Sequence, residues 1–584
     1  MIGFTMTLKR LFFLFSALTF NALHSATVNL TLNQLLTGGY GVTLNSFYTA
    51  GTKTLDLSGG PTGKITTTVN NGNIYYLTST SGLSAAVVAA GILIADVTTL
   101  NLSNNHLTSA ITPTFAGLTS LQILNVSNNQ LIGTLAGAFT GYTALREIYA
   151  YNNFLSGTLN GAFSGLTNLR VISCASNAFT GTLSSVFTGL ANLRTIYLSD
   201  NQFSGALAGI FSGLTNLQNI DLSNNQFTGT LAGVFSGLTN LVVISLGNNQ
   251  LTGTITGIFP NTTTLQQIYL YNNQFSGSLL GAFTLQTGLQ IISLNNNQFS
   301  GSLTGVLGQL KALQQIDCSN NQLTGSLSGV FTGLSSLQKI YLYNNQFSGV
   351  LTNVFSGLLS LTTLNLGANQ FSGSLAGVFA GLSSLEEIYI YNNQLSGSLS
   401  GVFAGLSVLN TLSLGSNQLS GSLSGVFIGL TTLAYIDLSN NQLTGSLSGV
   451  FTQQTALEQL DLSNNLLTGS LSGVFTGITS LEKLALSHNQ FSGSLSGLFT
   501  GLTALTTIAL DNNLFTGSLN STLTSQNALK SLDVSNNLFT SPTTNSFAAL
   551  AALSYLKLGN FYQLTGLQNR GLTTLAPNQG LQLH

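Results

Sequence analysis

The sequence predicts a solenoid, a fold in which short coils of equal length stack along one axis and share a continuous core. Three observations support this prediction. A 24-residue pattern repeats without insertion over residues 97–552, which gives 19 repeats in a chain of 584 residues. Hydrophobic residues make up 43% of the chain, so apolar side chains are plentiful enough for a core. The apolar residues of one repeat are too few to bury themselves, so successive repeats must pack against each other.

The segment 1–26 has the composition of a secretory signal peptide. Lys9 and Arg10 precede an apolar run at residues 11–20, and small residues follow at Ser25 and Ala26. The run is too short to span a bilayer, and no later stretch is long and apolar enough to do so. We therefore expect a secreted protein that acts outside the cell or at the cell surface and has no membrane span.

The charge of the chain is nearly balanced. Lys and Arg number 13, Asp and Glu number 14, and charged residues are 5% of the total. A chain of this charge is not concentrated on a phosphate backbone or on anionic lipid. We expect no nucleic-acid partner.

Each repeat has a fixed arrangement of apolar, Asn, Phe and Gly positions. Residues 217–240 read Leu-Gln-Asn-Ile-Asp-Leu-Ser-Asn-Asn-Gln-Phe-Thr-Gly-Thr-Leu-Ala-Gly-Val-Phe-Ser-Gly-Leu-Thr-Asn, with apolar residues at repeat positions 1, 4, 6, 11, 15, 19 and 22. Positions 4 and 6 alternate with polar residues as in a strand. Position 9 is Asn in all 19 repeats, which predicts a structural ladder that pairs backbone groups at a turn. Position 19 is Phe in 17 repeats and predicts a stacked aromatic column, whereas Gly at position 13 permits a tight or closely approached backbone.

The pattern Leu-x-x-Ile-x-Leu-x-x-Asn-x-Phe-x-Gly-x-Leu resembles the leucine-rich-repeat superfamily. Its Asn-x-Leu/Phe-x-Gly-x-Leu stretch is similar to the plant-type, 24-residue class of secreted and receptor-like proteins. The resemblance implies a curved or superhelical solenoid, with a parallel β-sheet on the concave face and short helical, 3-10 or extended segments on the convex side. It also implies recognition of a protein, peptide or glycan ligand on the concave face. The sequence departs from the class by lacking Ile-Pro at positions 15 and 16, the cysteine-paired caps, and the kinase and transmembrane parts. An exported bacterial or protist protein built on the same repeat fits these departures as well.

The two ends of the chain deviate from the repeat. Residues 27–96 are interpreted as an N-terminal cap with degenerate repeat character, seen in the Leu-Asp-Leu-Ser stretch at 55–58, because an open solenoid end would expose its core. Residues 553–584 are interpreted as a decayed last repeat and C-terminal cap, since Phe561 replaces the turn Asn.

The two cysteines are expected to be buried free thiols. Cys174 and Cys318 both occupy position 6, where the side chain points inward, in repeats that are six coils apart. At about 4.8 Å per coil they would be roughly 29 Å apart, far beyond the reach of a disulfide.

No arrangement typical of an enzyme is apparent. His106, His488 and His584 lie in distant parts of the chain, and the sequence has no Cys-His metal spacing, HExxH motif or phosphate loop. The recurring Gly-Ser-Leu-Ser-Gly, as at residues 421–425, has Leu where a nucleophile elbow has Ser. We expect a non-enzymatic protein with no cofactor and no metal.

Candidate binding residues occupy solvent-facing positions that differ between repeats, because packing imposes no choice there. Tyr at positions 5 and 7 offers a large contact area with a polar tip, although Tyr also suits a strand surface without any ligand. Arg at position 2 of three consecutive repeats would meet an anionic or aromatic group, although tandem duplication is the simpler explanation. The candidates are Tyr149, Tyr151, Tyr197, Tyr269, Tyr271, Tyr341, Tyr343, Tyr389, Tyr391, Arg146, Arg170, Arg194 and Glu386.

These features predict an extracellular binding, adhesion or recognition module that acts through the concave face. The alternative is ice binding, or binding of another regular surface, through Ser/Thr-Gly-Ser/Thr at positions 12 to 14, as in Thr228 and Thr230. If positions 11 and 15 point inward, these hydroxyls form a flat lattice with spacings of ~4.8 Å between coils and ~7 Å along the strand. Such a lattice resembles the hydroxyl arrays of ice-binding solenoids.

Overall fold

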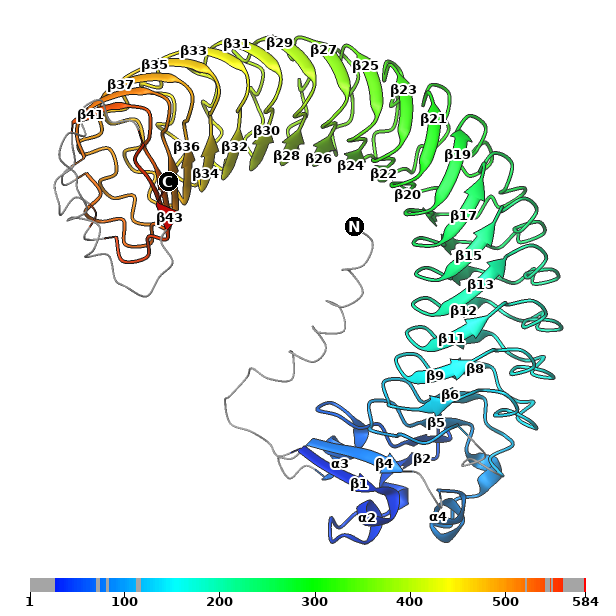
Figure 1. Ribbon diagram of the computed structural model, residues 1–584. Helices are drawn as coiled ribbons and strands as arrows, with labels where there is room; N and C mark the ends of the chain where they lie inside the picture. The colour runs from blue at the N-terminus through cyan, green and yellow to red at the C-terminus, as the bar shows by residue number, and fades with distance from the viewer. Residues whose placement is uncertain are drawn as a thin grey trace. The chain divides into compact units, whose positions relative to one another are not determined.

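The computed structural model describes residues 27–69, 74–79, 83–111, 117–519, 522–540, 547, 550–559 and 582–583. The predicted signal peptide and most of the predicted C-terminal cap lie outside these residues. The chain divides into two compact units, residues 1–227 and 228–584, which we treat separately. In each unit one sequence repeat forms one coil, and two series of parallel strands run through successive coils (Figure 1).

The first sheet is built from repeat positions 3 to 5. In the first unit its parallel partners share the same repeat position in adjacent coils, so Val171 lies beside Thr195. Residues at one repeat position are therefore neighbours across the sheet. A short strand β2 (Tyr48–Thr49) pairs antiparallel with β3 at the start of this sheet. The parallel strands are β3 (Thr54–Asp56), β5 (Thr99–Asn101), β6 (Ile123–Asn125), β8 (Glu147–Tyr149), β10 (Val171–Ser173), β12 (Thr195–Tyr197) and β14 (Asn219–Asp221).

The second unit continues the same pattern, with Gln267 beside Ile291. Here the first sheet lies on the concave side of the curved stack, as the resemblance implied (Figure 1). Its strands are β16 (Val243–Ser245), β18 (Gln267–Tyr269), β20 (Ile291–Ser293), β22 (Gln315–Asp317), β24 (Lys339–Tyr341), β26 (Thr363–Asn365), β28 (Glu387–Tyr389), β30 (Thr411–Ser413), β32 (Tyr435–Asp437), β34 (Gln459–Asp461), β36 (Lys483–Ala485), β38 (Thr507–Ala509), β40 (Ser531–Asp533), β42 (Tyr555–Lys557) and β43 (Gln582–Leu583).

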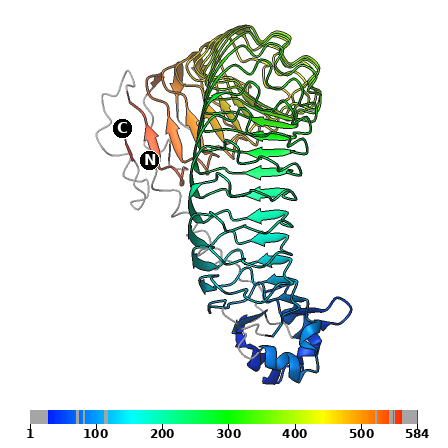
Figure 2. The same ribbon diagram turned by 90° about the vertical axis from the view of Figure 1, so that its right-hand side faces the viewer.

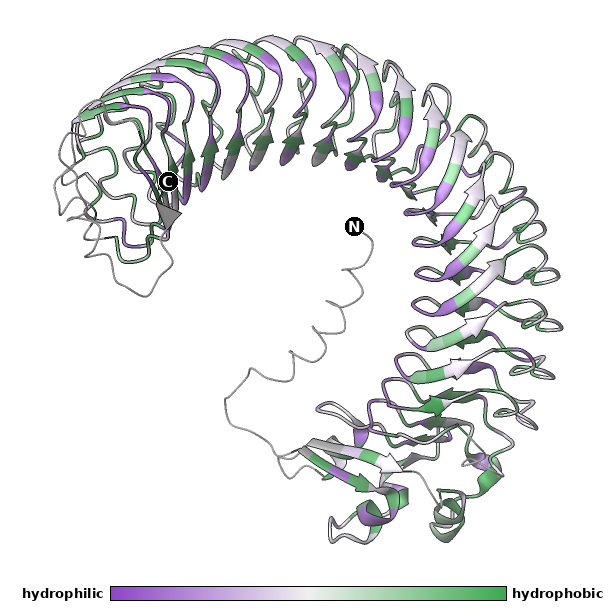
Figure 3. Cartoon of the chain, in the orientation of Figure 1, coloured by the Kyte–Doolittle hydropathy of each residue, from purple (hydrophilic) through white to green (hydrophobic). Residues whose placement is uncertain are grey.

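The second series of strands begins at repeat position 10. Its partners do not share a repeat position, because Thr180 at position 12 pairs with Gln202 at position 10 of the next coil. Each strand is thus shifted along its neighbour. In Figure 3 many of these strands have a hydrophilic segment followed by a hydrophobic one. In β15 the side chains of Gln226 and Thr228 are exposed and that of Phe227 between them is buried, which is the pattern of a half-buried sheet. The strands are β7 (Ile132–Gly133), β9 (Phe154–Gly157), β11 (Ala178–Gly181), β13 (Gln202–Ala206), β15 (Gln226–Gly229), β17 (Gln250–Gly253), β19 (Gln274–Ser278), β21 (Gln298–Gly301), β23 (Gln322–Gly325), β25 (Gln346–Gly349), β27 (Gln370–Gly373), β29 (Gln394–Ser398), β31 (Gln418–Ser422), β33 (Gln442–Gly445), β35 (Leu466–Gly469), β37 (Gln490–Ser494), β39 (Leu514–Ser518) and β41 (Leu538–Thr540).

The side of the coils away from the first sheet consists of these extended segments and of turns. The resemblance left open whether this side is helical, 3-10 or extended. In the described residues after residue 96 it is extended. Figure 2 shows the strands of successive coils stacked parallel to one another.

The helices precede the repeats, in the region interpreted as an N-terminal cap. Strand β1 pairs in parallel with β4 and forms a small separate sheet. Asn105 connects this region to the first coil, because its Oδ1 accepts from the Leu77 amide at 2.6 Å and its Nδ2 donates to the Leu57 carbonyl at 2.9 Å. The elements are β1 (Thr27–Thr31), α2 (Leu32–Thr37), η1 (Leu44–Phe47), α3 (Lys64–Val69), β4 (Ile74–Ser79), α4 (Leu83–Ala89) and η2 (Ile94–Asp96).

The predicted Asn ladder is confirmed. The side chain of Asn225 accepts from the Phe203 amide of the preceding coil at 3.0 Å and donates to the Leu198 carbonyl of that coil at 3.0 Å. The same amide group donates to Leu222 and Ser223 within its own coil. Each Asn thus pairs backbone groups of two coils at the bend that follows the first sheet.

The core contains two columns of Phe rather than one. At position 19 the predicted stacking is present, for example between Phe235 and Phe259, whose ring centroids are 5.6 Å apart. Phe at position 11 forms a second column where neighbouring repeats both have it, as with Phe179 and Phe203 at 6.1 Å. Stacked rings bury a large area in successive coils and stabilise the stack.

The predictions for Gly at position 13 and for the cysteines are also confirmed. Gly157 has a φ of +77°, and a Cβ added there would lie 2.8 Å from Cγ2 of Thr134 in the preceding coil. Both the backbone conformation and the close approach therefore require Gly. Cys174 and Cys318 are buried and free.

Candidate binding face

The charged residues of the coils gather on the first sheet. In the second unit all nine Asp and Glu residues occupy positions 2, 3, 5 or 7, which flank the inward-facing positions 4 and 6. In the coils of both units, every Asp, Glu, Lys and Arg residue occupies one of these four positions except Asp200 at position 8 and Lys311 at position 23. Packing does not demand this segregation, because the second sheet and the turns also meet solvent and carry uncharged residues there. The first-sheet face is therefore where side-chain chemistry varies.

Three of the predicted residues form an arginine ladder in the first unit. The amide of Arg170 donates to the Arg146 carbonyl at 2.6 Å, and the amide of Arg194 donates to the Arg170 carbonyl at 2.8 Å. The three side chains are exposed. None of them belongs to the ion pairs found in the described part of the chain, so their charges are available to a ligand.

Tyrosines lie beside this ladder. Tyr149 and Tyr197 flank Ser173 across three adjacent strands. The hydroxyl of Tyr149 donates to Oε2 of Glu147 at 2.8 Å, and burial together with this bond raises the pKa of Tyr149 to about 12. The phenol thus stays neutral and is held in one orientation. With the ladder, Tyr149, Tyr151 and Tyr197 form what we call the arginine–tyrosine patch.

Most of the predicted tyrosines are less exposed than their strand positions suggested. Tyr197 is 40% exposed, whereas the other eight are half-buried. For two tyrosines at position 7 the cause is a close contact between coils, because a Cβ added to Gly247 would lie 2.4 Å from Cζ of Tyr271 in the next coil. Tyr391 covers Gly367 in the same way. These two rings occupy the space that a side chain at position 7 of the preceding coil would need, and Gly leaves that space open.

A second group of candidates lies in the second unit and combines tyrosines with carboxylates. Burial, followed by the charge of Glu387, raises the pKa of Tyr341 and of Tyr389. The pKa of Tyr435 is raised similarly by burial and then by Asp437 and Asp461. We define the carboxylate–tyrosine patch as Tyr341, Tyr343, Glu387, Tyr389, Tyr391, Tyr435, Asp437 and Asp461.

The remaining candidates lie near this patch or apart from it. Glu386 is exposed at position 2, next to Glu387. Tyr269 and Tyr271 belong to β18 and its following turn, and the hydroxyl of Tyr269 donates to Oε1 of Gln267 at 3.2 Å. Sequence reasoning missed Tyr435 because it considered Tyr at positions 5 and 7, whereas Tyr435 is at position 3. Sorting all charged and aromatic residues by repeat position would have found it.

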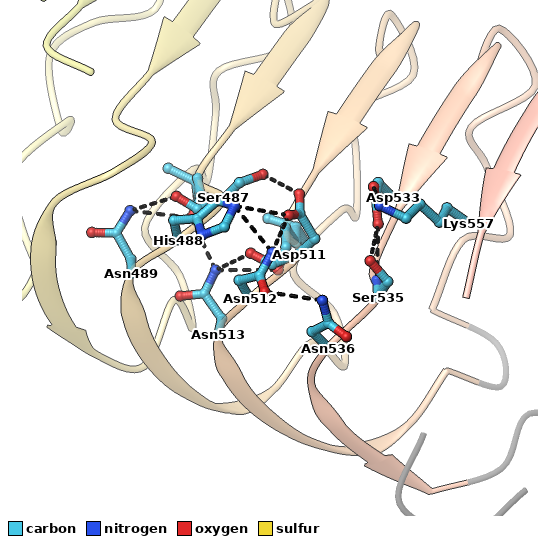
Figure 4. Close-up of polar contacts among 12 residues, drawn as sticks. Ser487, His488, Asn489, Asp511, Asn512, Asn513, Asp533, Ser535, Asn536 and Lys557 are labelled. Atoms are coloured by element: carbon cyan, nitrogen blue, oxygen red, sulfur yellow. Dashed lines mark hydrogen bonds and ion pairs between the residues drawn. The ribbon is translucent and has the colours of Figure 1, made fainter. Parts of the chain in front are cut away.

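Ser, His and Asp meet near the end of the first sheet (Figure 4). The hydroxyl of Ser487 donates to Oδ1 of Asp511, and Nε2 of His488 lies 3.5 Å from the other carboxylate oxygen. Asn512 Nδ2 is 3.1 Å from the same His nitrogen. Here the carboxylate lies between Ser and His, whereas a hydrolytic triad has His between Ser and Asp. The arrangement links two adjacent coils and does not place the imidazole on the serine hydroxyl.

In the described ranges no group of three or more His, Cys, Asp or Glu is placed to hold a metal ion. Nor does any helix described there have the length and apolar character needed to cross a membrane.

The Ser/Thr ranks of the second sheet are oblique rather than rectangular. Ser276 pairs with Gln298, and Ser278 pairs with Ser300, because neighbouring strands are shifted along each other. Position 14 of one coil thus lies beside position 12 of the next. This shift differs from the simple lattice that the sequence suggested.

Comparisons with known proteins identify the repeat. The leucine rich repeat family profile matches residues 95–203, 207–251 and 318–515 through overlapping segments, which is more than half of the chain. A search of curated proteins finds no match.

Several solved structures are similar to this chain. The plant peptide hormone receptor RGFR1, solved in complex with RGF2, is 27% identical, with a TM-score of 0.77 over 84% of this chain and 78% of that chain. The Arabidopsis receptor kinase HAESA, solved with the peptide hormone IDA and the co-receptor SERK1, is 26% identical, with a TM-score of 0.71 over 87% of this chain and 86% of that chain. A leucine-rich-repeat protein of Leptospira interrogans shares the fold at a TM-score of 0.53 and 23% identity, over 66% of this chain and 93% of that chain. With its stacked coils of constant length, its Asn ladder and these matches, the chain belongs to the leucine-rich-repeat family and resembles the plant receptor-like class.

Proposed function

We propose that the protein is a non-enzymatic, extracellular binding module that recognises a protein or peptide ligand through its first-sheet face. The observation that carries the proposal is the concentration of charged residues and of solvent-accessible tyrosines of the coils on that face, with Asp200 and Lys311 as the charged exceptions. Tyr and Arg are common anchors of protein interfaces, and charge on the same face adds orientation and specificity. The two plant receptors above, whose titles name bound peptide hormones, support a peptide or protein ligand.

Within the first unit we propose that the arginine–tyrosine patch contacts the ligand. The experiment selects binders from a displayed random nonapeptide library and measures their affinity for the full chain. We expect Tyr151→Ala combined with Arg170→Ala to weaken binding of the selected peptides by at least ~10-fold, because truncated interface anchors commonly cost ~2 kcal/mol. The urea midpoint should move little, since Arg170 is exposed and Tyr151 is half-buried on the surface of the sheet.

The matched control is Lys311→Ala combined with Gln226→Ala, which alters one cation and one polar side chain away from the face. It should leave affinity unchanged. If the double variant Tyr151→Ala/Arg170→Ala binds normally, the contact lies elsewhere, first of all near Glu386 and Tyr389. Failure to select any peptide or protein that depends on this face would reject the proposed function, as would turnover of a hydrolase substrate that depends on one side chain.

Ice binding remains a second candidate because Thr228 in β15 and Thr230 directly after this strand are both exposed. The oblique register argues against a close match to one ice plane. The candidate requires thermal hysteresis at micromolar protein that is lost when Thr228 and Thr230 are replaced by Lys. Ordinary ice growth with the unmodified protein would dismiss it.

A further inference from the structure

We infer that the carboxylate–tyrosine patch of the second unit binds an extended, cationic peptide segment that carries Arg or Lys side chains. The inference rests on the proposed function and specifies the ligand chemistry of one part of the face. It follows from the charge of the patch, from its aromatic rings and from its spacing.

The region carries an excess of negative charge, and Lys339 on β24 and Lys483 on β36 border it. Between Lys339 and Lys483 the chain contains six carboxylates, all at first-sheet positions, and no Lys, Arg or His. None of the six belongs to the ion pairs that the structure describes. Like charges gathered on one face raise its negative potential and favour a cationic partner. The six are Glu386, Glu387, Asp437, Glu458, Asp461 and Glu482.

The aromatic rings of the patch provide a second kind of contact for a cationic side chain. Glu387 and Tyr389 lie on the same strand, β28, and Tyr389 is aligned across Asn365 with Tyr341 two coils earlier. A carboxylate therefore lies near phenol rings from separate coils. A guanidinium or ammonium group can stack on a ring while it pairs with the adjacent carboxylate. Tyr391 is already packed over Gly367, which reduces the entropy lost when a ligand binds.

The distance between coils determines how long a peptide the patch can contact and how its basic residues must be spaced. Tyr341 and Asp461 are five coils apart at position 5, which corresponds to ~24 Å, or about seven residues of extended peptide. Glu387 and Asp437 lie on strands two coils apart, or ~10 Å. In an extended peptide of polyproline II conformation, residues three positions apart share a face and are ~9 Å apart, which matches this spacing. The segment would run across the strands and present Arg-x-x-Arg or Lys-x-x-Lys.

The test uses the full mature chain and the acetylated, amidated peptide Gly-Arg-Ser-Ser-Arg-Ser-Gly. Its Lys counterpart and its Gln counterpart differ in the two basic positions alone. We expect the Arg peptide to bind at least ~10-fold more tightly than the Gln peptide and to weaken as salt rises. Glu387→Gln combined with Asp437→Asn should remove this preference, and Tyr389→Ala should weaken the Arg peptide more than the Lys peptide because Arg stacks better.

The matched control is Asp200→Asn combined with Asp221→Asn, which removes two carboxylates outside the patch. It should leave the Arg preference intact, and urea midpoints show whether each variant is folded. If the double patch variant does not fold, Glu387→Gln alone should still reduce the preference.

Equal binding of the Arg and Gln peptides, or an equal loss in the control, would overturn the inference. Self-association that the patch substitutions abolish would assign the patch to a second copy of the chain and overturn it as well. If library peptides without basic residues bind the face while the Arg peptide does not, the inference fails and the proposed function stands. If no peptide binds, both fail.

Discussion

A left-handed backbone residue ends the first-sheet segment in every coil. Position 8 has a φ of +51° to +57° in each repeat from Asn104 to Asn536. Asn tolerates this conformation better than other residues with a Cβ, and it occupies the position in most coils. Ala368 is one exception and has no side-chain polar group to offset the strain.

Ala368→Asn should therefore stabilise the protein by ~1 kcal/mol, the order of the left-handed penalty that Asn relieves. The shift would be measured as a higher urea midpoint with an unchanged slope. The reverse change in the next coil, Asn392→Ala, should cost a similar amount. Equal stability of Ala368→Asn and the unmodified protein would show that the strain is relieved in some other way.

A second residue-level effect concerns a carboxylate that the coil partly buries. Burial raises the pKa of Asp317, although the amide and hydroxyl of Ser319 both donate to its Oδ1. A folded pKa above the unfolded value of 3.8 means that the folded state holds this proton more tightly. The contribution of Asp317 to the free energy of unfolding is therefore fully present below pH 3.8 and is lost as pH rises through the folded pKa.

Asp317→Asn should remove the loss of stability that accompanies ionisation of the Asp317 carboxyl. Asn365 occupies the same repeat position and accepts from the Gly367 amide, so the coil accommodates Asn there. The stability gained over the unmodified protein should increase from about pH 3 to about pH 7 in urea titrations. A gain that is constant over this range would contradict the assigned cause.

At the scale of one turn, three coils have another residue followed by Gln at positions 21 and 22, where most coils have Gly and Leu. Most coils have Gly at position 21 and Leu at position 22, as in Gly429 and Leu430, and the glycine has positive φ. In three coils position 21 is not Gly and position 22 is a buried Gln. The side-chain amide of Gln454 donates to the Phe427 carbonyl at 2.8 Å, and its oxygen accepts from the Gln453 amide at 3.3 Å.

A double-mutant cycle tests this exchange. Gln454→Leu alone should cost ~1 kcal/mol or more, because it leaves the Gln453 amide without its partner. Gln453→Gly combined with Gln454→Leu should recover at least half of that loss, since it restores the turn of the preceding coil. The coupling free energy comes from urea denaturation of the four proteins. Additive losses would show that the two positions do not act together.

At the scale of the whole molecule, the two thiols report on the opening of each compact unit. Cys174 lies in the first unit and Cys318 in the second, and both are inaccessible. Burial raises the pKa of the Cys174 thiol to about 12 and also raises that of Cys318. A thiol in this state is a poor nucleophile because little thiolate is present.

We expect neither cysteine to react with a maleimide near neutral pH until denaturant opens its coil. Peptide mass spectrometry at increasing urea concentrations would give a separate midpoint for each thiol. Fast labelling without urea would contradict the buried positions. Cys174→Ala and Cys318→Ala provide matched single-thiol controls.

The repeating architecture was predictable from the sequence. Insertion-free repeats predict stacked coils, the invariant Asn predicts a ladder, and Phe at position 19 predicts a stacked column, because each column needs the same residue in the same register. The arginine ladder was predictable for the same reason. Residues separated by one period must be neighbours when each period makes one coil, as Arg146 and Arg170 are.

The sequence by itself thus determined the coil, its core and the face with variable chemistry. The tertiary structure decided how neighbouring coils meet. It set the shift between second-sheet strands that makes the Ser/Thr ranks oblique, and it laid Tyr391 over Gly367. It also aligned Tyr389, on the strand of Glu387, with Tyr341 of an earlier coil. These features depend on side-chain contacts between coils, and a one-dimensional period fixes which residues are neighbours without fixing how their side chains pack.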